Sequence, residues 1–204
     1  MGSLADRGSG ASSASDSGFV VGISAVAGRF EGEPWAFHAC RWYAGNLTDL
    51  GTLLPDPPPG TSARPSSGAL GVTELGRVVG WSDGPAGVSA AFLWLPKPGL
   101  GLPVGMSALP VPDPSLPSLA RRANDQAWIV GEHTINSPSG PTTRAALWRF
   151  DAHPGAWTFT DPGTLGGPTA RAAAINASGQ ICGRSADAAG RDHAFLWLPL
   201  PAFG

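Results

Sequence analysis

The sequence predicts an all-β fold: a β-propeller-like array of about four blades, each with three to four short antiparallel strands. First, a short apolar strand ending in glycine recurs about every fifty residues, at Gly22, Gly80, Gly131 and Gly183. Second, after each glycine and a variable loop comes another strand that ends in tryptophan, at Trp42, Trp94, Trp148 and Trp197. Third, no helical periodicity of useful length interrupts this pattern. Four short strands in a repeat of this length are typical of a propeller blade.

The composition agrees with many turns between short strands. The 204 residues include 29 glycines and 21 prolines, which are the residues that turns require. The hydrophobic fraction of 42% and the periodic tryptophans argue against a disordered chain. Residues 1–17 are rich in Gly, Ser and Ala and lack an apolar core, so they predict a flexible tail rather than a strand or a signal peptide.

Charge and hydropathy exclude several classes of partner. The net charge of −2 and the single lysine, Lys97, give no long-range attraction to nucleic acid or to acidic membranes. No apolar run reaches the roughly 18 residues that a membrane span needs. We therefore expect no nucleic-acid partner and no membrane span.

The fourth unit shows the elements most clearly. A first strand at 171–175 leads into a turn at 176–179, followed by a second strand at 180–185 and a third at 193–197. Asn176 favours the opening position of a type I turn, and Gly179 supplies the positive φ that follows in a hairpin. The glycine inside each second strand indicates a bulge or a close approach of another backbone.

The other units repeat this order and define one repeat domain, 18–204. Its units span about 18–53, 68–109, 120–167 and 170–204. A fourth strand follows the tryptophan in the first three units. No first strand is recognisable in the first unit, and no fourth strand in the last. We expect either a cramped four-bladed ring or an open arc that self-associates through its sheet edges. The runner-up is a β-sandwich or an open solenoid of four-stranded sheets.

Three motifs resemble the HAF repeat, a bacterial repeat family described as probably extracellular and named after its His-Ala-Phe tripeptide. They are the Ile-Asn-x-x-Gly-Gln turn at 175–180, the His193-Ala194-Phe195 strand and the Asp-x-Gly-Thr-Leu-Gly-Gly segment at 161–167. The first unit has His38-Ala39-Cys40 in place of the tripeptide. The resemblance covers about 18–204 and implies the repeat fold and an extracellular or cell-surface location. It brings no established activity.

The polar residues of the repeat favour a structural role over a metal site. His38 and His193 share one repeat position, which Ala90 and Arg144 hold in the other units. Framework hydrogen bonds to neighbouring turns are therefore expected from the histidines, because convergent ligands at metal-site spacing are missing. The first hairpin turns contain Asp16, Asn124, Asp125 and Asn176, which we expect to cap those turns rather than to bind calcium.

Two cysteines, Cys40 and Cys182, occupy apolar strand positions. Buried free thiols are the default expectation for such positions. The alternative is a disulfide that joins the first and last units across a ring closure, which requires Cα atoms within roughly 7 Å.

The loops between the second and third strands vary most, and variable loops on one face of a scaffold are where binding residues concentrate. The longest loop contains Arg29 and Trp35. These two residues form a candidate ligand contact, with the alternative that Trp35 covers the core.

Together these observations predict a non-enzymatic extracellular repeat protein that serves as a binding or structural scaffold for an unknown protein or carbohydrate. No nucleophile elbow, phosphate loop or paired carboxylate stands out, so no catalytic, cofactor-binding or metal residue is predicted. The alternative is a hydrolase-type enzyme with its site in the central funnel of the propeller. A perturbed histidine or converging carboxylates there would favour the enzyme.

Overall fold

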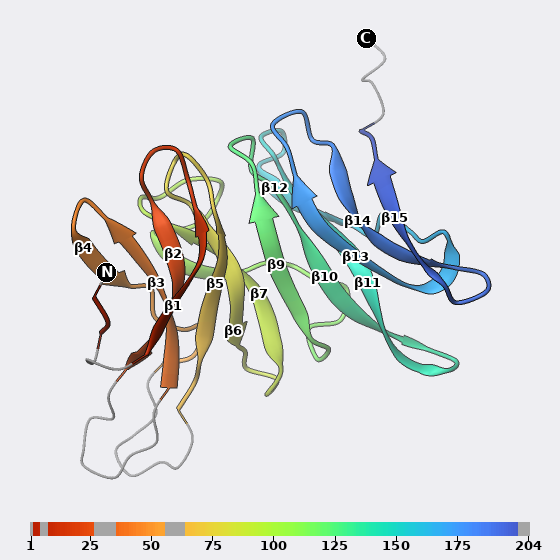
Figure 1. Cartoon of the computed structure of the whole chain (residues 1–204), viewed down its shortest axis with the longest axis horizontal. Helices are drawn as coiled ribbons and strands as arrows, with labels where there is room; N and C mark the ends of the chain where they lie inside the picture. Colours follow the sequence, from red (N-terminus) through yellow and green to blue (C-terminus); the bar gives the residue numbers. More distant parts are fainter. Residues whose placement is uncertain (1, 5–7, 27–35, 56–63, 200–204) are drawn as a thin grey trace.

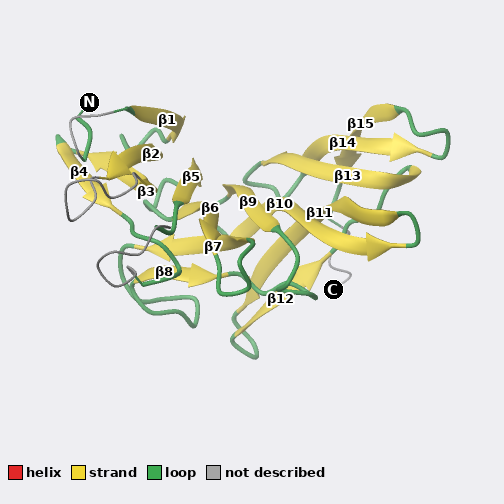
Figure 2. Ribbon diagram, turned by 90° about the horizontal axis from the view of Figure 1, so that it is seen from below, coloured by secondary structure: helices red, strands yellow, loops and turns green. Residues whose placement is uncertain are grey.

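The computed structural model describes residues 2–4, 8–26, 36–55 and 64–199, and within them the chain is entirely β. Fifteen strands form four separate antiparallel sheets. The sheets follow one another in a curved row, with the first and the fourth at its two ends in both views (Figures 1 and 2). The predicted all-β array of four units is confirmed. Within the described ranges no sheet pairing joins the two ends, so the row is an open arc rather than a closed ring.

Each sheet is a meander whose strands pair in chain order. The first sheet contains β1 (Ser9–Ala14), β2 (Val20–Val26), β3 (Ala36–Tyr43) and β4 (Asn46–Asp49). The second contains β5 (Ser67–Val72), β6 (Val78–Asp83), β7 (Ser89–Leu95) and β8 (Gly105–Ala108). The third contains β9 (Ser118–Ala123), β10 (Trp128–Ser137), β11 (Gly140–Asp151) and β12 (Ala156–Thr160). The fourth contains β13 (Gly166–Ile175), β14 (Ile181–Asp187) and β15 (Asp192–Trp197).

The first sheet has a first strand, which corrects two predictions. Residues 9–14 form β1 and pair with β2 from Ser9 to Ala14, so the expected tail at 1–17 contains a strand and the first unit is not cut short. The six residues are Ser, Gly and Ala, which have little intrinsic β propensity. They form a strand because β2 supplies the backbone partners, while nearly all of their side chains face solvent.

The second and third strands of each sheet pair in the same register in all four sheets. Gly22 pairs with Cys40 in the first sheet, and the corresponding glycines pair with Phe92, Ala146 and Phe195. On the other side these glycines pair with an alanine, and one extra residue follows the alanine in each first strand. The four sheets therefore share one β-bulge at one position.

This bulge explains the repeated glycine. A Cβ built on Gly131 would lie 2.0 Å from the carbonyl oxygen of Leu119 on β9. At Gly22, Gly80 and Gly183 the corresponding distance is 1.9–2.0 Å. No side chain can occupy that space, so only glycine permits the first strand to approach. The sequence-based interpretation, a bulge or a close backbone approach, is confirmed in both of its forms.

The cores lie between neighbouring sheets. We call the face that packs on the preceding sheet the leading face and the opposite one the trailing face. Between the first two sheets, Val21 and Ala39 of the first trailing face meet Phe92 and Trp94 of the second leading face. The other two junctions repeat this pattern, with Trp148 and Trp197 in the place of Trp94. Three of the four repeated tryptophans therefore pack between neighbouring units.

Two of the four predicted turn caps are confirmed, and in the first unit Ser15 rather than Asp16 accepts the Phe19 N–H, at 3.3 Å. The side-chain oxygen of Asn124 accepts a hydrogen bond from the Trp128 N–H at 3.0 Å, and Asn176 accepts one from Gln180 at 2.9 Å. Gly179 has a φ of +75°, and Ala127 holds the same position in the third unit with a φ of +62°. Turn capping is therefore the role of both asparagines.

In three of the four sheets a serine two residues after the glycine binds the incoming linker, whereas the third sheet has His133 at this position. Ser82 Oγ accepts the Leu53 N–H at 2.9 Å, and Ser185 Oγ accepts the Leu165 N–H at the same distance. Ser24 Oγ accepts the Leu4 N–H in the same way. The Gly2-Ser3-Leu4 segment thus lies on the first sheet as the Gly-Thr-Leu linkers lie on the second and fourth sheets. The first sheet therefore binds the segment that precedes it in the way that the second and fourth sheets bind their incoming linkers.

Candidate binding cleft

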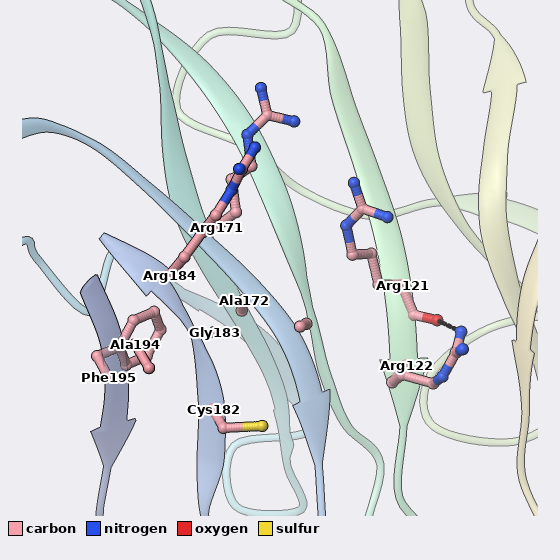
Figure 3. Close-up of a pocket in the computed structure, with 10 residues that line it drawn as sticks. Arg121, Arg122, Arg171, Ala172, Cys182, Gly183, Arg184, Ala194 and Phe195 are labelled. Atoms are coloured by element: carbon pink, nitrogen blue, oxygen red, sulfur yellow. Dashed lines mark hydrogen bonds between the residues drawn. The ribbon is translucent and has the colours of Figure 1, made fainter. Parts of the chain in front are cut away.

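An arginine-lined cleft lies where the first strand of the third sheet meets the fourth sheet. Its volume is about 490 Å³, within the usual range for small-ligand sites. Figure 3 shows Arg121 and Arg122 on β9 at one side and Arg171 and Arg184 on the fourth sheet at the other. The remaining lining residues are small or apolar: Ala172, Ala173, Cys182, Gly183, Ala194 and Phe195.

The shared bulge positions the arginines of β9. Ala120 pairs with Gly131 and Arg122 with Val130, so Arg121 is the extra residue of the bulge. A bulge redirects the side chains around it, and here two consecutive arginines reach the same cleft. On the fourth sheet, Arg171 and Arg184 are direct cross-strand partners. Four arginines from three different strands therefore line one cleft, although the Arg122 guanidinium itself binds the Leu70 carbonyl of the second sheet.

A buried carboxylate joins the two sides of the cleft. Glu132 on β10 accepts two hydrogen bonds at Oε1 from Arg121, one of them from Nε at 2.6 Å. Its Oε2 lies 2.9 Å from Nη1 of Arg171. The Glu132 side chain is only 6% exposed. Charge-assisted bonds of this kind are short and strong, so Glu132 ties the third sheet to the fourth.

Of the other two guanidinium groups, that of Arg184 is the more available to a ligand, because that of Arg122 is bonded to two backbone carbonyls, one of them on the second sheet. Arg122 donates to the carbonyl oxygens of Leu70 and Arg121, which leaves its positive charge without a balancing anion in those contacts. Arg184 faces Asp192 at 3.4 Å, but both side chains are more than half exposed, so the pair is weak. No acidic residue is among those that line the cleft. The cleft therefore presents excess positive charge.

The floor of the cleft is apolar. Phe195 is half-buried and lies beside Ala172 and Ala194. Guanidinium groups match the geometry of carboxylates and sulfates, and an aromatic ring offers a flat apolar surface. A ligand that combines acidic groups with a flat apolar face fits both features.

The residues predicted from the sequence lie elsewhere. Arg29 and Trp35 fall within 27–35, outside the described residues. His38 Nδ1 lies 2.9 Å from Asp49, and His193 Nε2 lies 3.0 Å from Asp187. These are the framework hydrogen bonds that we expected. Within the described part of the chain, no three His, Cys, Asp or Glu side chains converge as metal ligands.

The cysteines differ from each other. Both are free; Cys40 is buried as expected, whereas Cys182 is exposed, so the expectation of two buried thiols is wrong for Cys182. The reason is that the trailing face of the fourth sheet carries no further sheet among the described residues. Burial, followed by the nearby Asp49 charge, raises the pKa of the Cys40 thiol to about 12.

A second cavity of about 230 Å³ contains a buried histidine. His133 and Ser118 line it, and Glu132 reaches it from the arginine cleft. Nε2 of His133 has no hydrogen-bond partner and lies 3.8 Å from Asp161, which pairs more closely with Arg144 at 3.1 Å. The Ser118 hydroxyl accepts the Ala91 N–H at 2.9 Å. The arrangement therefore brings an imidazole and a serine into one cavity without a hydrogen bond from Nε2 to that serine.

Sequence reasoning missed the four cleft arginines. The Arg121-Arg122 pair inside a strand was a visible signal, because the chain contains only 13 lysines and arginines. The four residues hold different positions in the repeat, so aligning the units does not show that they meet. Their meeting depends on the bulge and on the packing of the third sheet against the fourth.

Comparisons with known proteins give no relative for this chain. No protein-family model matches it, and no curated protein is significantly similar to it in sequence. Among the described residues, no helix is long and apolar enough to cross a membrane.

Proposed function

We propose that this chain is a non-enzymatic, propeller-like repeat scaffold that binds an acidic carbohydrate in the arginine cleft. The extracellular or cell-surface location rests on the resemblance to the HAF repeat. The observation that carries the proposal is the cleft itself, in which four arginines line a cavity of about 490 Å³ and the buried carboxylate of Glu132 balances part of their charge.

An acidic carbohydrate suits both halves of the cleft. Its carboxylate or sulfate groups can accept paired hydrogen bonds from Arg184. The apolar face of a sugar ring can pack on Phe195, which is half-buried at the base of the cleft. Neutral sugars satisfy only the second requirement.

Calorimetric titration with an oligogalacturonate tests the proposal, and a neutral cello-oligosaccharide of equal length serves as the control probe. We expect saturable binding of the uronate that weakens as salt is added. The Arg184→Ala variant should bind about tenfold more weakly, since a hydrogen bond to a charged group contributes about 1.5–3 kcal/mol. Lys97→Ala removes an exposed positive charge outside the cleft and should leave the affinity unchanged.

Two results would overturn the proposal. The first is no binding of the uronate by the unmodified protein. The second is equal weakening by Arg184→Ala and Lys97→Ala, which would show attraction by general charge. Binding of polyglutamate instead of the uronate would replace the carbohydrate by an acidic peptide.

The alternative function is a hydrolase, and one observation favours it. His133 is buried with an unpartnered Nε2 in the cavity that Ser118 also lines. Against it, Glu132 is already held by two guanidinium groups and the Ser118 hydroxyl by a backbone N–H. Turnover of activated ester or glycoside substrates that disappears in a folded His133→Gln variant would establish the enzyme in place of the scaffold.

A further inference from the structure

Among the described residues nothing covers the trailing face of the fourth sheet, whereas the next sheet covers each of the other three trailing faces. Leu196 holds the repeat position that Leu93 holds in the second sheet and Leu147 in the third. Leu93 and Leu147 are each 1% exposed, whereas Leu196 is 64% exposed. Cys182 is exposed at the position of Val21, Val79 and Val130, and Ala194 is exposed at that of Ala39, Ala91 and Ala145; all six counterparts are 0% exposed. This face is thus the continuation of an interface that the chain forms three times.

The leading face of the first sheet is the matching half at the other end of the arc. On this face Ala11 is exposed and Val20 is half-buried, whereas Cys40 and Trp42 are 0% and 8% exposed. The counterparts of Ala11 and Val20 in the other sheets are 0% exposed: Ala69, Ala120 and Ala172, and Val78, Ile129 and Ile181. The Gly2-Ser3-Leu4 segment already lies on this sheet as a linker lies on an incoming unit, with Leu4 fastened to Ser24 and the Trp42 indole donating to the Gly2 carbonyl. The Trp148 indole contacts the Pro110 carbonyl of its linker in the same way.

The charges on the two faces permit their contact. At the third junction Glu132 pairs with Arg171. In a junction between the fourth and first sheets, Arg184 would take the place of Glu132, and Gly10 would take the place of Arg171. No two like charges therefore meet at these positions. The corresponding positions on both faces are again apolar, although Cys40 replaces phenylalanine in two of the other sheets and Cys182 replaces valine.

We propose that the trailing face of the fourth sheet binds the leading face of the first sheet in a second copy of this chain. The junction is head-to-tail, so it either closes when the copies complete a ring or continues as an open chain of copies. It involves sheet faces rather than the sheet edges predicted from the sequence. The proposal does not rest on the acidic-carbohydrate function. Leu196 does not line the arginine cleft, but Cys182, Arg184 and Ala194 belong to both surfaces, so association and ligand binding should compete.

Sedimentation and light scattering over a wide concentration range test the association. We expect the unmodified chain to form dimers or larger assemblies, because bare apolar faces of this kind associate. Leu196→Glu blocks the trailing face and Ala11→Arg blocks the leading face, and each variant alone should be monomeric. Val104→Glu changes an exposed apolar residue, 58% exposed, that belongs to neither face and should associate like the unmodified chain.

Mixing the two blocked variants gives the decisive result. Each retains one intact face, so the mixture should form a one-to-one dimer and nothing larger. Failure of the mixture to associate overturns the head-to-tail junction, and so does a monomeric unmodified chain at every concentration. Circular dichroism confirms that the variants are folded.

The thiol of Cys182 provides a second, independent measure. It is exposed in the single chain and lies on the trailing face, so maleimide should modify it rapidly in dilute protein. Association should slow this modification at least several-fold in concentrated unmodified protein but not in Leu196→Glu. An equal rate in both would mean that the face stays open and would overturn the proposal.

Discussion

The carbonyl oxygen of Arg171 lies in the space that a side chain on Gly183 would need, 2.0 Å from the position of its Cβ. The same relation joins Gly10 with Gly22, Gly68 with Gly80 and Leu119 with Gly131. The repeated glycine is therefore required by the backbone of the first strand, whose bulge turns one carbonyl toward the second strand. Any side chain at this position must displace backbone atoms.

Replacing Gly131 by Ala should destabilise the protein by at least about 2–3 kcal/mol, because the added methyl group overlaps backbone atoms on both sides of the bulge. The measurement is the free energy of unfolding in urea. Gly99→Ala is the matched control, since a Cβ at Gly99 meets nothing within 4 Å, and it should change the stability by less than about 0.5 kcal/mol. Equal effects of the two substitutions would contradict this account of the glycine.

Replacing Ser82 by Ala should release the linker that follows the first sheet. The Leu53 N–H would lose its acceptor, which costs about 1–2 kcal/mol for a partly buried group. Hydrogen exchange gives the specific test, because the Leu53 amide should exchange faster while amides of the fourth sheet do not change. Ser185→Ala should show the same effect at Leu165 instead.

Replacing Glu132 by Gln should have opposite effects on stability and on ligand binding. The fold should lose about 1–3 kcal/mol, since a buried ion pair is broken although its arginine partners remain partly exposed to water. The affinity for an acidic probe should rise, because Arg121 and Arg171 no longer share a carboxylate. Denaturation and calorimetry on the same sample measure the two effects, and a weakened affinity would count against the cleft as the binding site.

The protein should lose stability in acid. Burial opposes ionisation of Asp49, but the hydrogen bonds from His38 and from the Gly51 N–H outweigh it and lower the pKa of Asp49. At Asp161, burial is likewise outweighed by His133, the Gly163 N–H and Arg144, so that pKa is also lowered. A carboxyl whose pKa is lower in the folded state stabilises the fold fully above its unfolded pKa of about 3.9, and this stabilisation disappears as the pH falls through the folded value.

Urea midpoints from pH 7 to pH 2 measure this dependence. We expect little change down to about pH 5 and a steady loss below about pH 4. In Asp161→Asn the midpoint should be lower at pH 7 and should approach that of the unmodified protein in acid. A constant difference at all pH values would show that ionised Asp161 does not contribute.

The two thiols should differ sharply in reactivity. In dilute native protein one thiol, Cys182, should react with a maleimide or disulfide reagent, because Cys40 is buried and its raised pKa of about 12 suppresses the thiolate. Under denaturing, non-reducing conditions both should react. A single reactive thiol in the native Cys182→Ser variant would contradict the burial of Cys40.

The local features of the repeat were predictable from the sequence. The glycine permits the bulge in all four units, the asparagine caps the turn in the third and fourth, and the tryptophan packs between sheets in the last three. The strand β1 was not predictable, because Ser, Gly and Ala carry no β signal and only the pairing with β2 defines it.

What the sequence alone determined is thus the unit: four meanders with a common register, because periodic residues act through contacts within a unit or with its neighbour. Only the tertiary structure decided how the units accumulate into an open arc, which arginines meet in a cleft and which sheet face stays bare. These properties depend on the angle between successive sheets. That angle is set by the combined packing of whole faces, so no single recurring residue predicts it.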